Sequence, residues 1–266
     1  MNDLLFNLAW LFIALTFLPA LLLMTLTWFV ARRLDNWSIV DVAWAYGFVL
    51  ILALPFAALP RDTAEIVRGE WHSNPVLWLA AAMGLWSLRL GTHLAVRVLG
   101  HLKEEDGRYR RMREQHGARM PRKMAVFYFQ QALALALLLL PFIAAAADGG
   151  REPAGPVHRI GLAVFATGLL MESRADAQLR AFKSDPANRG KVCDIGLWAW
   201  TRHPNYLGEF LIWVGFALLS FTPNLLGLPG LVCAAGIWWL LNRVTGIPLT
   251  EAQLLASKGE AYRAYQ

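Results

Sequence analysis

The chain has 266 residues, of which 57% are apolar and 17% are charged, and its formal net charge is +6. Soluble domains carry about 25% charged residues, so this composition argues against an ordinary soluble protein. The two cysteines, Cys193 and Cys233, form no CxxC pair, and we expect neither a disulfide framework nor a zinc site. We also expect no nucleic-acid partner.

The first apolar run, from Leu4 to Val30, contains no Lys, Arg, Asp or Glu. It exceeds the roughly 20 residues that a helix needs to cross the hydrocarbon core, and it lacks the basic start and shorter apolar core of a secretory signal. Further apolar runs follow at about 39–60, 76–99, 124–147, 157–181, 206–221 and 226–243. Because a chain in lipid must satisfy its own backbone hydrogen bonds, each run is predicted to be helical. The sequence therefore predicts an all-α polytopic membrane protein with about seven transmembrane helices, forming one membrane-embedded domain over residues 1–266.

Basic residues are distributed unevenly between successive connecting loops. The loops after the first, third and fifth runs and the C-terminal tail are rich in them: Arg32, Arg33, Lys103, Arg108, Arg110, Arg111, Arg113, Arg119, Arg122, Lys123, Lys183, Arg189, Lys191, Arg202, Arg243, Lys258 and Arg263. The loops after the second and fourth runs hold Arg61, Arg68, Arg151 and Arg159. Because cytoplasmic loops carry the excess of Lys and Arg, the rich side is predicted to be cytoplasmic, with the N-terminus outside and the C-terminus inside.

Asp41 lies inside the second apolar run, where an ionisable side chain is costly and is therefore a candidate for function. Trp44 follows one helical turn later on the same side, whereas Tyr46 points away from it. The structural alternative is that Asp41 pairs with a basic residue such as Arg89 and fixes the packing of two helices.

The third run carries Arg89, His93 and Arg97 at intervals of four, which places three side chains that can be cationic on one helix face. Arg97 is close enough to the end of the run to reach the membrane interface. The charged segment 104–113 follows directly. It is either a solvated loop or, since arginine suits bidentate phosphate recognition, part of a phosphate site.

Polar residues also gather where the fifth and sixth runs meet the cytoplasmic side. Glu172, Asp176 and Arg180 share one helix face, partly as ordinary i, i+4 neighbours. Pro204 suits the first turn of the sixth helix, and Glu209 then lies within that run. With the tail after Glu251 added, four segments bring polar residues to one side, which favours a functional site over separate structural pairs.

Several motifs of other enzyme classes are absent from the sequence. There is no GxGxxG and no GxxxxGK[ST], so any nucleotide is held by neither a Rossmann nor a Walker loop. The histidines form no HxxxH or HxxHH cluster, and we expect no di-iron or zinc site. No GxSxG nucleophile elbow occurs, and no internal repeat of the kind found in transporters is visible.

Two segments resemble the steroid 5α-reductase family: 176–183, which opens Asp-Ala-Gln-Leu, and 196–209, which ends Arg-His-Pro-Asn-Tyr-Leu-Gly-Glu. Two more resemble its bacterial members: 41–44 (Asp-Val-Ala-Trp) and 105–109 (Glu-Asp-Gly-Arg-Tyr). The likeness covers most of the chain and is most specific over residues 172–210. The Arg-His-Pro-x-Tyr motif also occurs, with a similar tail, in isoprenylcysteine methyltransferases and Δ14-sterol reductases. Asn205 and Glu209, with the preceding Asp-Ala-Gln-Leu, favour a reductase.

The resemblance implies NADPH as cofactor and reduction of the carbon–carbon double bond of a lipophilic enone, a 3-oxo-Δ4-steroid, by hydride transfer and protonation. By position it places around the cofactor Asp176, Lys183, Asn205 and Glu209, and beside it Arg202, His203 and Tyr206. To these we add, as further cofactor-binding candidates, Arg89, Arg97, Arg108, Tyr109 and Arg180. In the animal enzymes a glutamate and a tyrosine hold the 3-keto oxygen; here Asp41 stands for the glutamate, and no tyrosine falls on the third run.

Hydride addition to an enone builds negative charge on the carbonyl oxygen, so a neutral acid is needed there. An apolar, water-poor pocket favours the neutral form of a carboxyl group. We therefore expect Asp41 to donate a hydrogen bond to the substrate carbonyl, with Trp44 as a wall for a flat substrate. Tyr46 and His93 are the other catalytic candidates.

Two other classes of function stay open at this level. A lipid or prenylcysteine methyltransferase would use S-adenosylmethionine, which has no phosphate for the many arginines. A transporter or scaffold would not need polar groups concentrated at one face of the bilayer. The expected location is a multi-pass position in a bacterial inner membrane, with membrane lipid and a lipophilic small molecule as partners and no oligomer implied.

Overall fold

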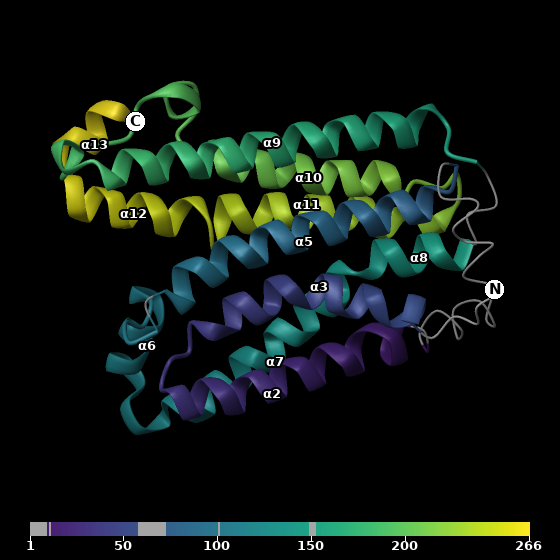
Figure 1. Cartoon of the computed structure of the whole chain (residues 1–266), viewed down its shortest axis with the longest axis horizontal. Helices are drawn as coiled ribbons and strands as arrows, with labels where there is room; N and C mark the ends of the chain where they lie inside the picture. Colours follow the sequence, from purple (N-terminus) through teal and green to yellow (C-terminus); the bar gives the residue numbers. More distant parts are fainter. Residues whose placement is uncertain (1–9, 11, 58–72, 101, 149–152) are drawn as a thin grey trace. The chain divides into compact units, whose positions relative to one another are not determined.

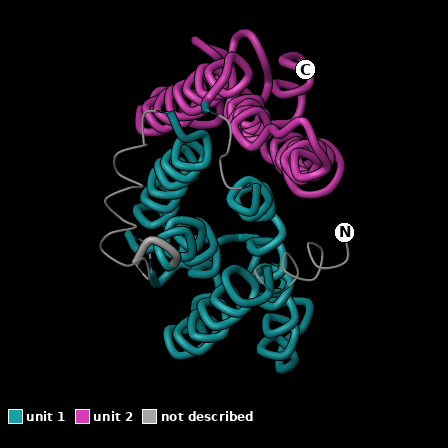
Figure 2. The backbone as a smooth tube through the Cα atoms, turned by 90° about the vertical axis from the view of Figure 1, so that its right-hand side faces the viewer, with its two compact units in different colours: residues 1–153 teal, residues 154–266 magenta. Residues whose placement is uncertain are grey.

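The computed structural model describes residue 10 and residues 12–57, 73–100, 102–148 and 153–266. Every regular element in these ranges is a helix, which confirms the predicted all-α class (Figure 1). The chain divides into two compact units, residues 1–153 and 154–266, which Figure 2 colours separately. The sequence predicted that residues 1–266 form a single reductase domain. The division into two compact units does not test whether they work as one functional domain, so this stays a prediction. Part of the first apolar run and the basic residues Arg61, Arg68 and Arg151 lie outside the described residues.

The first unit consists of helices α2 (Leu18–Leu34), α3 (Ile39–Ala57), α5 (Pro75–Leu99), α6 (Gly107–His116), α7 (Met120–Leu138) and α8 (Leu140–Asp148). A π-helical turn, Ile13–Phe17, precedes α2, and the 3-10 turn Gly117–Arg119 joins α6 to α7. α3 packs along α5, and α2 packs along α7. The core between these helices is aromatic, with Trp37, Phe48, Trp86 and Tyr128 almost fully buried.

Local sequence signals explain where several of these helices begin and end. The side chain of Asn74 accepts a hydrogen bond from the amide of Val76 and caps α5, and Pro75 occupies the first helical position. Asp106 caps α6 in the same way, by accepting from the amide of Arg108. α2 ends at Asp35, which adopts the left-handed conformation with φ 50°.

The second unit consists of α9 (Pro156–Ser184), α10 (Pro204–Leu219), α11 (Leu228–Arg243), α12 (Ile247–Lys258) and α13 (Glu260–Tyr265). Short 3-10 turns lie at Pro186–Asn188, Gly196–Ala199 and Leu225–Gly227. α10 lies alongside both α9 and α11 (Figure 1).

Glycines allow the backbones of α9 and α10 to approach closely. A Cβ atom on Gly208 would lie 2.7 Å from the amide nitrogen of Glu172 and 2.8 Å from the carbonyl oxygen of Gly168. One heptad away, a Cβ atom on Gly161 would lie 3.1 Å from the carbonyl oxygen of Gly215. The pairing of 168 with 208 and of 161 with 215 makes the two helices antiparallel. Since α10 therefore begins opposite Glu172, the rest of α9 as far as Ser184 extends beyond it.

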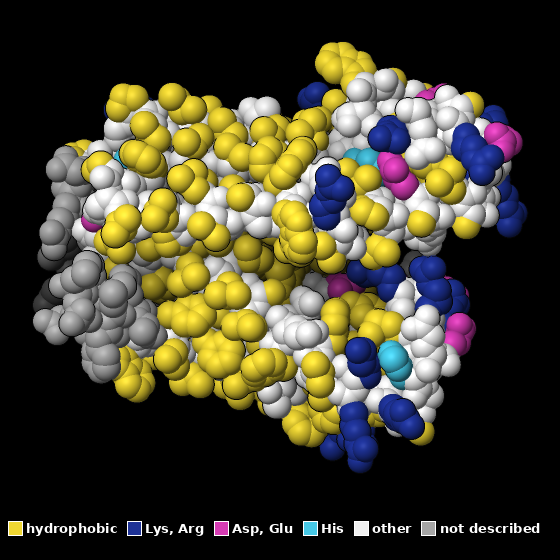
Figure 3. Space-filling view, turned by 180° about the vertical axis from the view of Figure 1, so that it is seen from behind, with side chains coloured by type: hydrophobic (Ala, Val, Ile, Leu, Met, Phe, Trp, Pro, Cys, Tyr) yellow, Lys and Arg dark blue, Asp and Glu magenta, His cyan; other side chains and the backbone are white. Residues whose placement is uncertain are grey.

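Three described helical segments are long and apolar enough to cross a membrane, by length and composition: Ile13–Leu34, Gly107–Asp148 and Leu225–Lys258. Two shorter apolar helices cover Ile39–Leu54 and Pro204–Leu219. In each unit, hydrophobic side chains cover the lengths of the helices, and Lys and Arg gather toward one end (Figure 3). The chain is thus built as a membrane protein, while seven spans and the orientation of the termini stay predictions.

Candidate functional site

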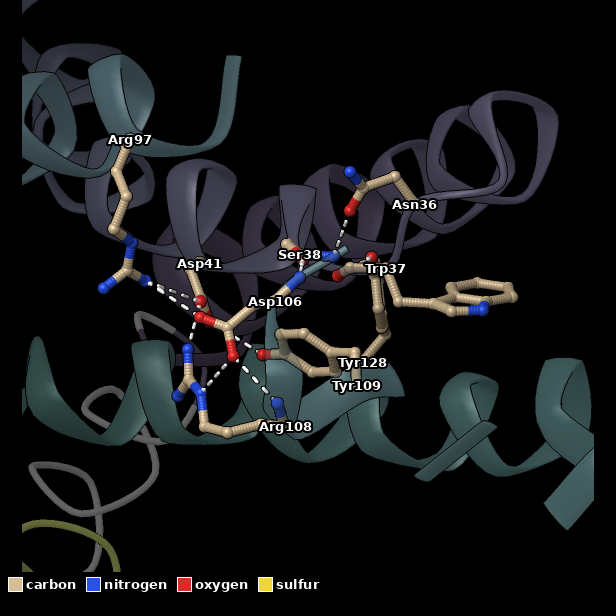
Figure 4. A network of polar contacts seen from close by, with 9 residues as sticks. All are labelled: Asn36, Trp37, Ser38, Asp41, Arg97, Asp106, Arg108, Tyr109 and Tyr128. Atoms are coloured by element: carbon tan, nitrogen blue, oxygen red, sulfur yellow. Dashed lines mark hydrogen bonds and ion pairs between the residues drawn. The ribbon is translucent and has the colours of Figure 1, made fainter. Parts of the chain in front are cut away.

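In the first unit, Asp41 is the centre of a polar network at the start of α3 (Figure 4). Its Oδ2 accepts from Nη2 of Arg108 at 2.6 Å, and its Oδ1 accepts from the hydroxyl of Tyr109 at 2.8 Å. Nη2 of Arg97 lies 3.6 Å from Oδ2 of Asp41 and 3.6 Å from Oδ2 of Asp106. The network therefore ties α3 to the end of α5 and the start of α6.

The loop before α3 and the loop before α6 are hydrogen-bonded to each other beneath this network. The amide of Asp106 donates to Oγ of Ser38 at 2.9 Å, and the amide of Trp37 donates to Oε1 of Glu105 at 3.0 Å. Arg113 then holds Glu105 with two hydrogen bonds, from Nε at 2.9 Å and from Nη2 at 3.0 Å. These contacts fix α6, and hence Arg108 and Tyr109, against α3.

The position of Asp41 corrects one expectation from the sequence. Asp41 was expected either to be isolated in an apolar pocket or to pair with a basic residue such as Arg89; the structure shows it bound by Arg108, Arg97 and Tyr109, so it is not isolated and it does pair with basic residues. Its Oδ1 and Oδ2 both accept hydrogen bonds, so the carboxyl group acts here as an acceptor. An isolated neutral acid is not what this geometry provides.

Asp106 shows the electrostatic effect of the same arginines. Burial raises the pKa of the Asp106 carboxyl, but the hydrogen bonds from Arg108 and the charges of Arg108 and Arg97 outweigh burial and hold the pKa below its usual value. The Asp106 side chain accepts from Nε of Arg108 at 3.1 Å. The guanidinium of Arg108 therefore bridges two carboxylates while its side chain stays 51% exposed.

The other catalytic candidates of the first unit lie on α3 and α5. The indole Nε1 of Trp44 is buried and has no hydrogen-bond partner within the described part of the chain, and its ring packs edge-on against Phe48. The hydroxyl of Tyr46 pairs with Oγ1 of Thr92 at 3.0 Å. Arg89 and His93 are half-buried on α5.

In the second unit, the carboxylate of Glu251 on α12 contacts three polar side chains. Its Oε1 lies 3.0 Å from Nε2 of His203 and 3.1 Å from Nη1 of Arg202. Its Oε2 accepts from Nε2 of Gln266 at 3.3 Å. Burial lowers the pKa of His203, although Glu251 opposes that shift. The Arg-His pair of the motif is thus held by a carboxylate from the C-terminal segment.

Tyr206 extends this arrangement along the first turn of α10. Its ring stacks on the imidazole of His203, with centroids 5.5 Å apart and planes 15° apart. Its hydroxyl pairs with Oγ1 of Thr250 at 3.0 Å. Two consecutive residues of α12, Thr250 and Glu251, therefore bind Tyr206 in the first turn of α10 and His203, the residue just before that helix.

The other predicted cofactor residues of this unit lie on α9 and α10. Asp176 is half-buried, and Arg180 and Lys183 are exposed on the part of α9 that extends past the start of α10. Glu209 accepts from the indole of Trp213 at 2.9 Å. Oδ1 of Asn205 is buried and has no hydrogen-bond partner within residues 153–266 or the rest of the described chain.

Sequence reasoning missed Glu251 as a partner of the motif, and it treated Gln178 only as a family marker. Oε1 of Gln178 accepts from the amide of Leu197 at 3.0 Å, and its amide group covers Gly196, which has φ 58°. The indole of Trp198 donates to the carbonyl of Ala175 at 3.0 Å. The Asp-Ala-Gln-Leu segment therefore anchors the loop that leads into α10. In the sequence, the one feature that could have pointed to Glu251 was its position as an isolated acidic residue near the start of the tail.

Comparison of the sequence with known protein families assigns the chain to one of them. Residues 27–266 match the profile of a family described as protein of unknown function (DUF1295), and the chain belongs to that family. No solved structure matches the chain.

Three curated relatives share parts of the sequence. A probable O-methyltransferase of Ustilaginoidea virens is 41% identical over 73 residues, which are 27% of this chain and 25% of that protein. A steroid 5-alpha-reductase of Solanum lycopersicum is 38% identical over 63 residues, 24% of each chain. An uncharacterized protein of Schizosaccharomyces pombe is 30% identical over 169 residues, 56% of this chain and 49% of that protein. The chain thus spans about a quarter of the first two relatives and about half of the third.

Proposed function

We propose that this chain is a membrane-embedded, NADPH-dependent reductase that adds hydrogen across the carbon–carbon double bond of a lipophilic enone, such as a 3-oxo-Δ4-steroid. The local similarity to a steroid 5-alpha-reductase supports this reaction class. The apolar helices support a location in a membrane, and we propose that this is a bacterial inner membrane and that the substrate enters from lipid.

The buried Oδ1 of Asn205 is the observation that carries the proposal. Buried polar atoms are almost always hydrogen-bonded, and an exception needs an explanation. Asn205 lies in the first turn of α10, two residues after His203, and its Oδ1 has no hydrogen-bond partner in the described chain. A ligand with an amide N–H, such as the carboxamide of nicotinamide, would satisfy this oxygen.

The charges around this unit fit a phosphorylated cofactor. The segment from the end of α9 to the following loop exposes five cations: Arg174, Arg180, Lys183, Arg189 and Lys191. Phosphate groups bind well to such side chains, and arginine can hold them with paired hydrogen bonds. S-adenosylmethionine carries no phosphate and would leave these cations unused.

When bound, NADPH supplies the hydride for the reduction. Asn205, Asp176 and Glu209 would hold the polar groups of the cofactor, and Arg180 and Lys183 would hold its phosphates. His203 and Tyr206 would give the site a stacked aromatic wall. Arg97 and Arg108 stay further phosphate candidates on the first unit.

The structure changes which residue we assign as the hydrogen-bond donor to the substrate carbonyl. Asp41 already accepts hydrogen bonds on both oxygens, so we assign it to holding Arg108 and Tyr109 in place. Trp44 lies one turn further on α3, and its buried indole N–H lacks a partner in the described residues. We therefore propose Trp44 as the hydrogen-bond donor to the developing enolate, since a donor aimed at that oxygen stabilises its charge.

Titration of the purified protein in detergent with NADPH and, separately, with S-adenosylmethionine tests the cofactor. The Asn205→Leu variant should bind NADPH about tenfold more weakly, because a ligand donor left without an acceptor costs about 1–3 kcal/mol. Its unfolding temperature should not fall, since the variant removes an unsatisfied buried oxygen. Asn242→Leu, at an amide that donates to the carbonyl of Trp238, is the matched control and should not change NADPH affinity.

A methyltransferase is the second candidate, because the probable O-methyltransferase shares 41% identity over 73 residues. The same titration separates the two candidates. Binding of S-adenosylmethionine without binding of NADPH would replace the reductase by the methyltransferase.

A further inference from the structure

The C-terminal segment 247–266 is folded onto the start of α10. Thr250 and Glu251 bind Tyr206 and His203, respectively, each at 3.0 Å. Further along, the hydroxyl of Tyr265 donates to the carbonyl of Trp198, in the turn that precedes α10. The segment is therefore attached both to the Arg-His-Pro-Asn-Tyr motif itself and to the turn that precedes it.

The geometry determines which nitrogen of His203 carries a hydrogen. A carboxylate only accepts hydrogen bonds, so the contact with Oε1 of Glu251 requires a hydrogen on Nε2 of His203. In the neutral imidazole, Nδ1 is then an acceptor. The stack with Tyr206 fixes the plane of the ring, and the imidazole is only 6% exposed.

Glu251 is itself held in place by its other contacts. Arg202 binds the oxygen that His203 binds, and Gln266 binds the other oxygen. The carboxylate is thus fixed in position before any ligand arrives. A histidine oriented in this way by a fixed carboxylate has a set tautomer and a set direction for its free nitrogen.

We propose that Glu251 is a positioning residue that keeps the His203 imidazole protonated on Nε2 and presents Nδ1 as an acceptor to the cofactor, so that the C-terminal segment is part of the cofactor site. This inference rests on the proposed function for the identity of the cofactor. The orientation of His203 by Glu251 does not depend on that identity.

Nitrogen-15 NMR of histidine-labelled protein tests the orientation directly, with His203→Gln used to assign the signal. In the unmutated protein, Nδ1 of His203 should resonate as an unprotonated nitrogen at neutral pH. In Glu251→Gln the His203 titration should move to lower pH, because the carboxylate that favours the imidazolium is gone. Glu260→Gln is the matched control, since Glu260 lies on the same segment, is 83% exposed and pairs with Arg263.

Binding of NADPH to the same variants tests the link to the cofactor. For histidines that ligate metals, loss of the outer partner typically costs about 10–100-fold in affinity or activity. By analogy we expect a loss of about tenfold or more in NADPH affinity for Glu251→Gln, and none for Glu260→Gln. If Glu251→Gln folds poorly, Glu251→Asp is the alternative, because it keeps the negative charge on a side chain one methylene shorter. It should show a smaller shift of the His203 titration and a smaller loss of NADPH affinity.

The possible outcomes separate the two proposals. An Nδ1-protonated His203, or an unchanged His203 titration in Glu251→Gln, overturns the positioning role. A shifted titration with unchanged NADPH affinity overturns the link to the cofactor. If the unmutated protein binds no NADPH, the proposed function fails, and the NMR result alone decides whether Glu251 orients His203.

Discussion

The sequence is enough to identify Asp41 as an unusual residue, but not to identify the residues that bind it. A carboxyl group inside an apolar run is recognisable from the sequence alone. Its partners are not, because Arg108 and Tyr109 follow 67 and 68 residues later and reach Asp41 only through the packing of α6 against α3. Local spacing carries no information about such a contact, so the sequence suggested Arg89 on the next helix instead.

We expect Asp41→Asn to lower the free energy of unfolding by roughly 1–3 kcal/mol, because an NH2 group would replace one of the two oxygens that accept from Arg108 and Tyr109, and the negative charge beside Arg108 would be lost. Asp35→Asn is the control. Asp35 also pairs with an arginine, Arg113, but its side chain is 80% exposed, and such surface pairs contribute about 0–1 kcal/mol. Thermal unfolding in detergent measures both variants. Equal stability of Asp41→Asn and the unmutated protein would show that the hydrogen bonds of Asp41 do not contribute to the stability of the fold.

Asn205 and Glu251 illustrate the same limit at the second site. The sequence identifies Asn205 as a candidate, because the Arg-His-Pro-Asn-Tyr motif is contiguous and runs into the first turn of α10. It could not show that Oδ1 of Asn205 lacks a partner, since that depends on every neighbour in three dimensions. Glu251 is 48 residues from His203, and their contact depends on the return of the tail.

At the scale of elements, apolar runs predicted the positions of most helices in the described residues closely. The third run was expected at about 76–99 and is α5, Pro75–Leu99, because Asn74 and Pro75 mark its start. The fourth run was expected as one helix over about 124–147, but the helix breaks at Leu139. Pro141 explains the break, since it lacks an amide hydrogen and its ring clashes with the preceding turn.

The contact between α9 and α10 depends on glycine, and this can be tested. Gly208→Ala should destabilise the protein by about 1–3 kcal/mol, because the new Cβ atom would lie 2.7 Å from the backbone of Glu172. Small residues let helices approach in this way within membranes. The measurement is the unfolding temperature in detergent.

Gly236→Ala is the matched control for this prediction. Gly236 is also inside a helix, α11, but a Cβ atom there would meet nothing within 4 Å. We expect this variant to be neutral or more stable by about 0.4–1 kcal/mol, since alanine restricts the unfolded chain. Similar losses at both positions would mean that the close approach of α9 and α10 is not what Gly208 provides.

At the scale of the whole molecule, composition was enough to predict a helical membrane protein, because few charges and long apolar runs leave no other solution in lipid. The division after Pro153 into two compact units was not predicted, since no change in composition marks it. The number of spans is also not decided by length alone. α10 has 16 residues and is about 24 Å long at 1.5 Å per residue, which is short of a core about 30 Å thick.

Cysteine labelling on either side of α10 tests whether this short helix crosses the membrane. Ala187 lies in the turn after α9, and Leu225, which is 76% exposed, lies in the turn after α10. With Cys193 and Cys233 replaced by serine, single cysteines at 187 and 225 should react with an impermeant maleimide from opposite sides of the membrane. Position 187 should face the side rich in Lys and Arg, because that side is predicted to be cytoplasmic. Labelling of both positions from one side would mean that α10 does not cross, and the seven-span topology would then be wrong.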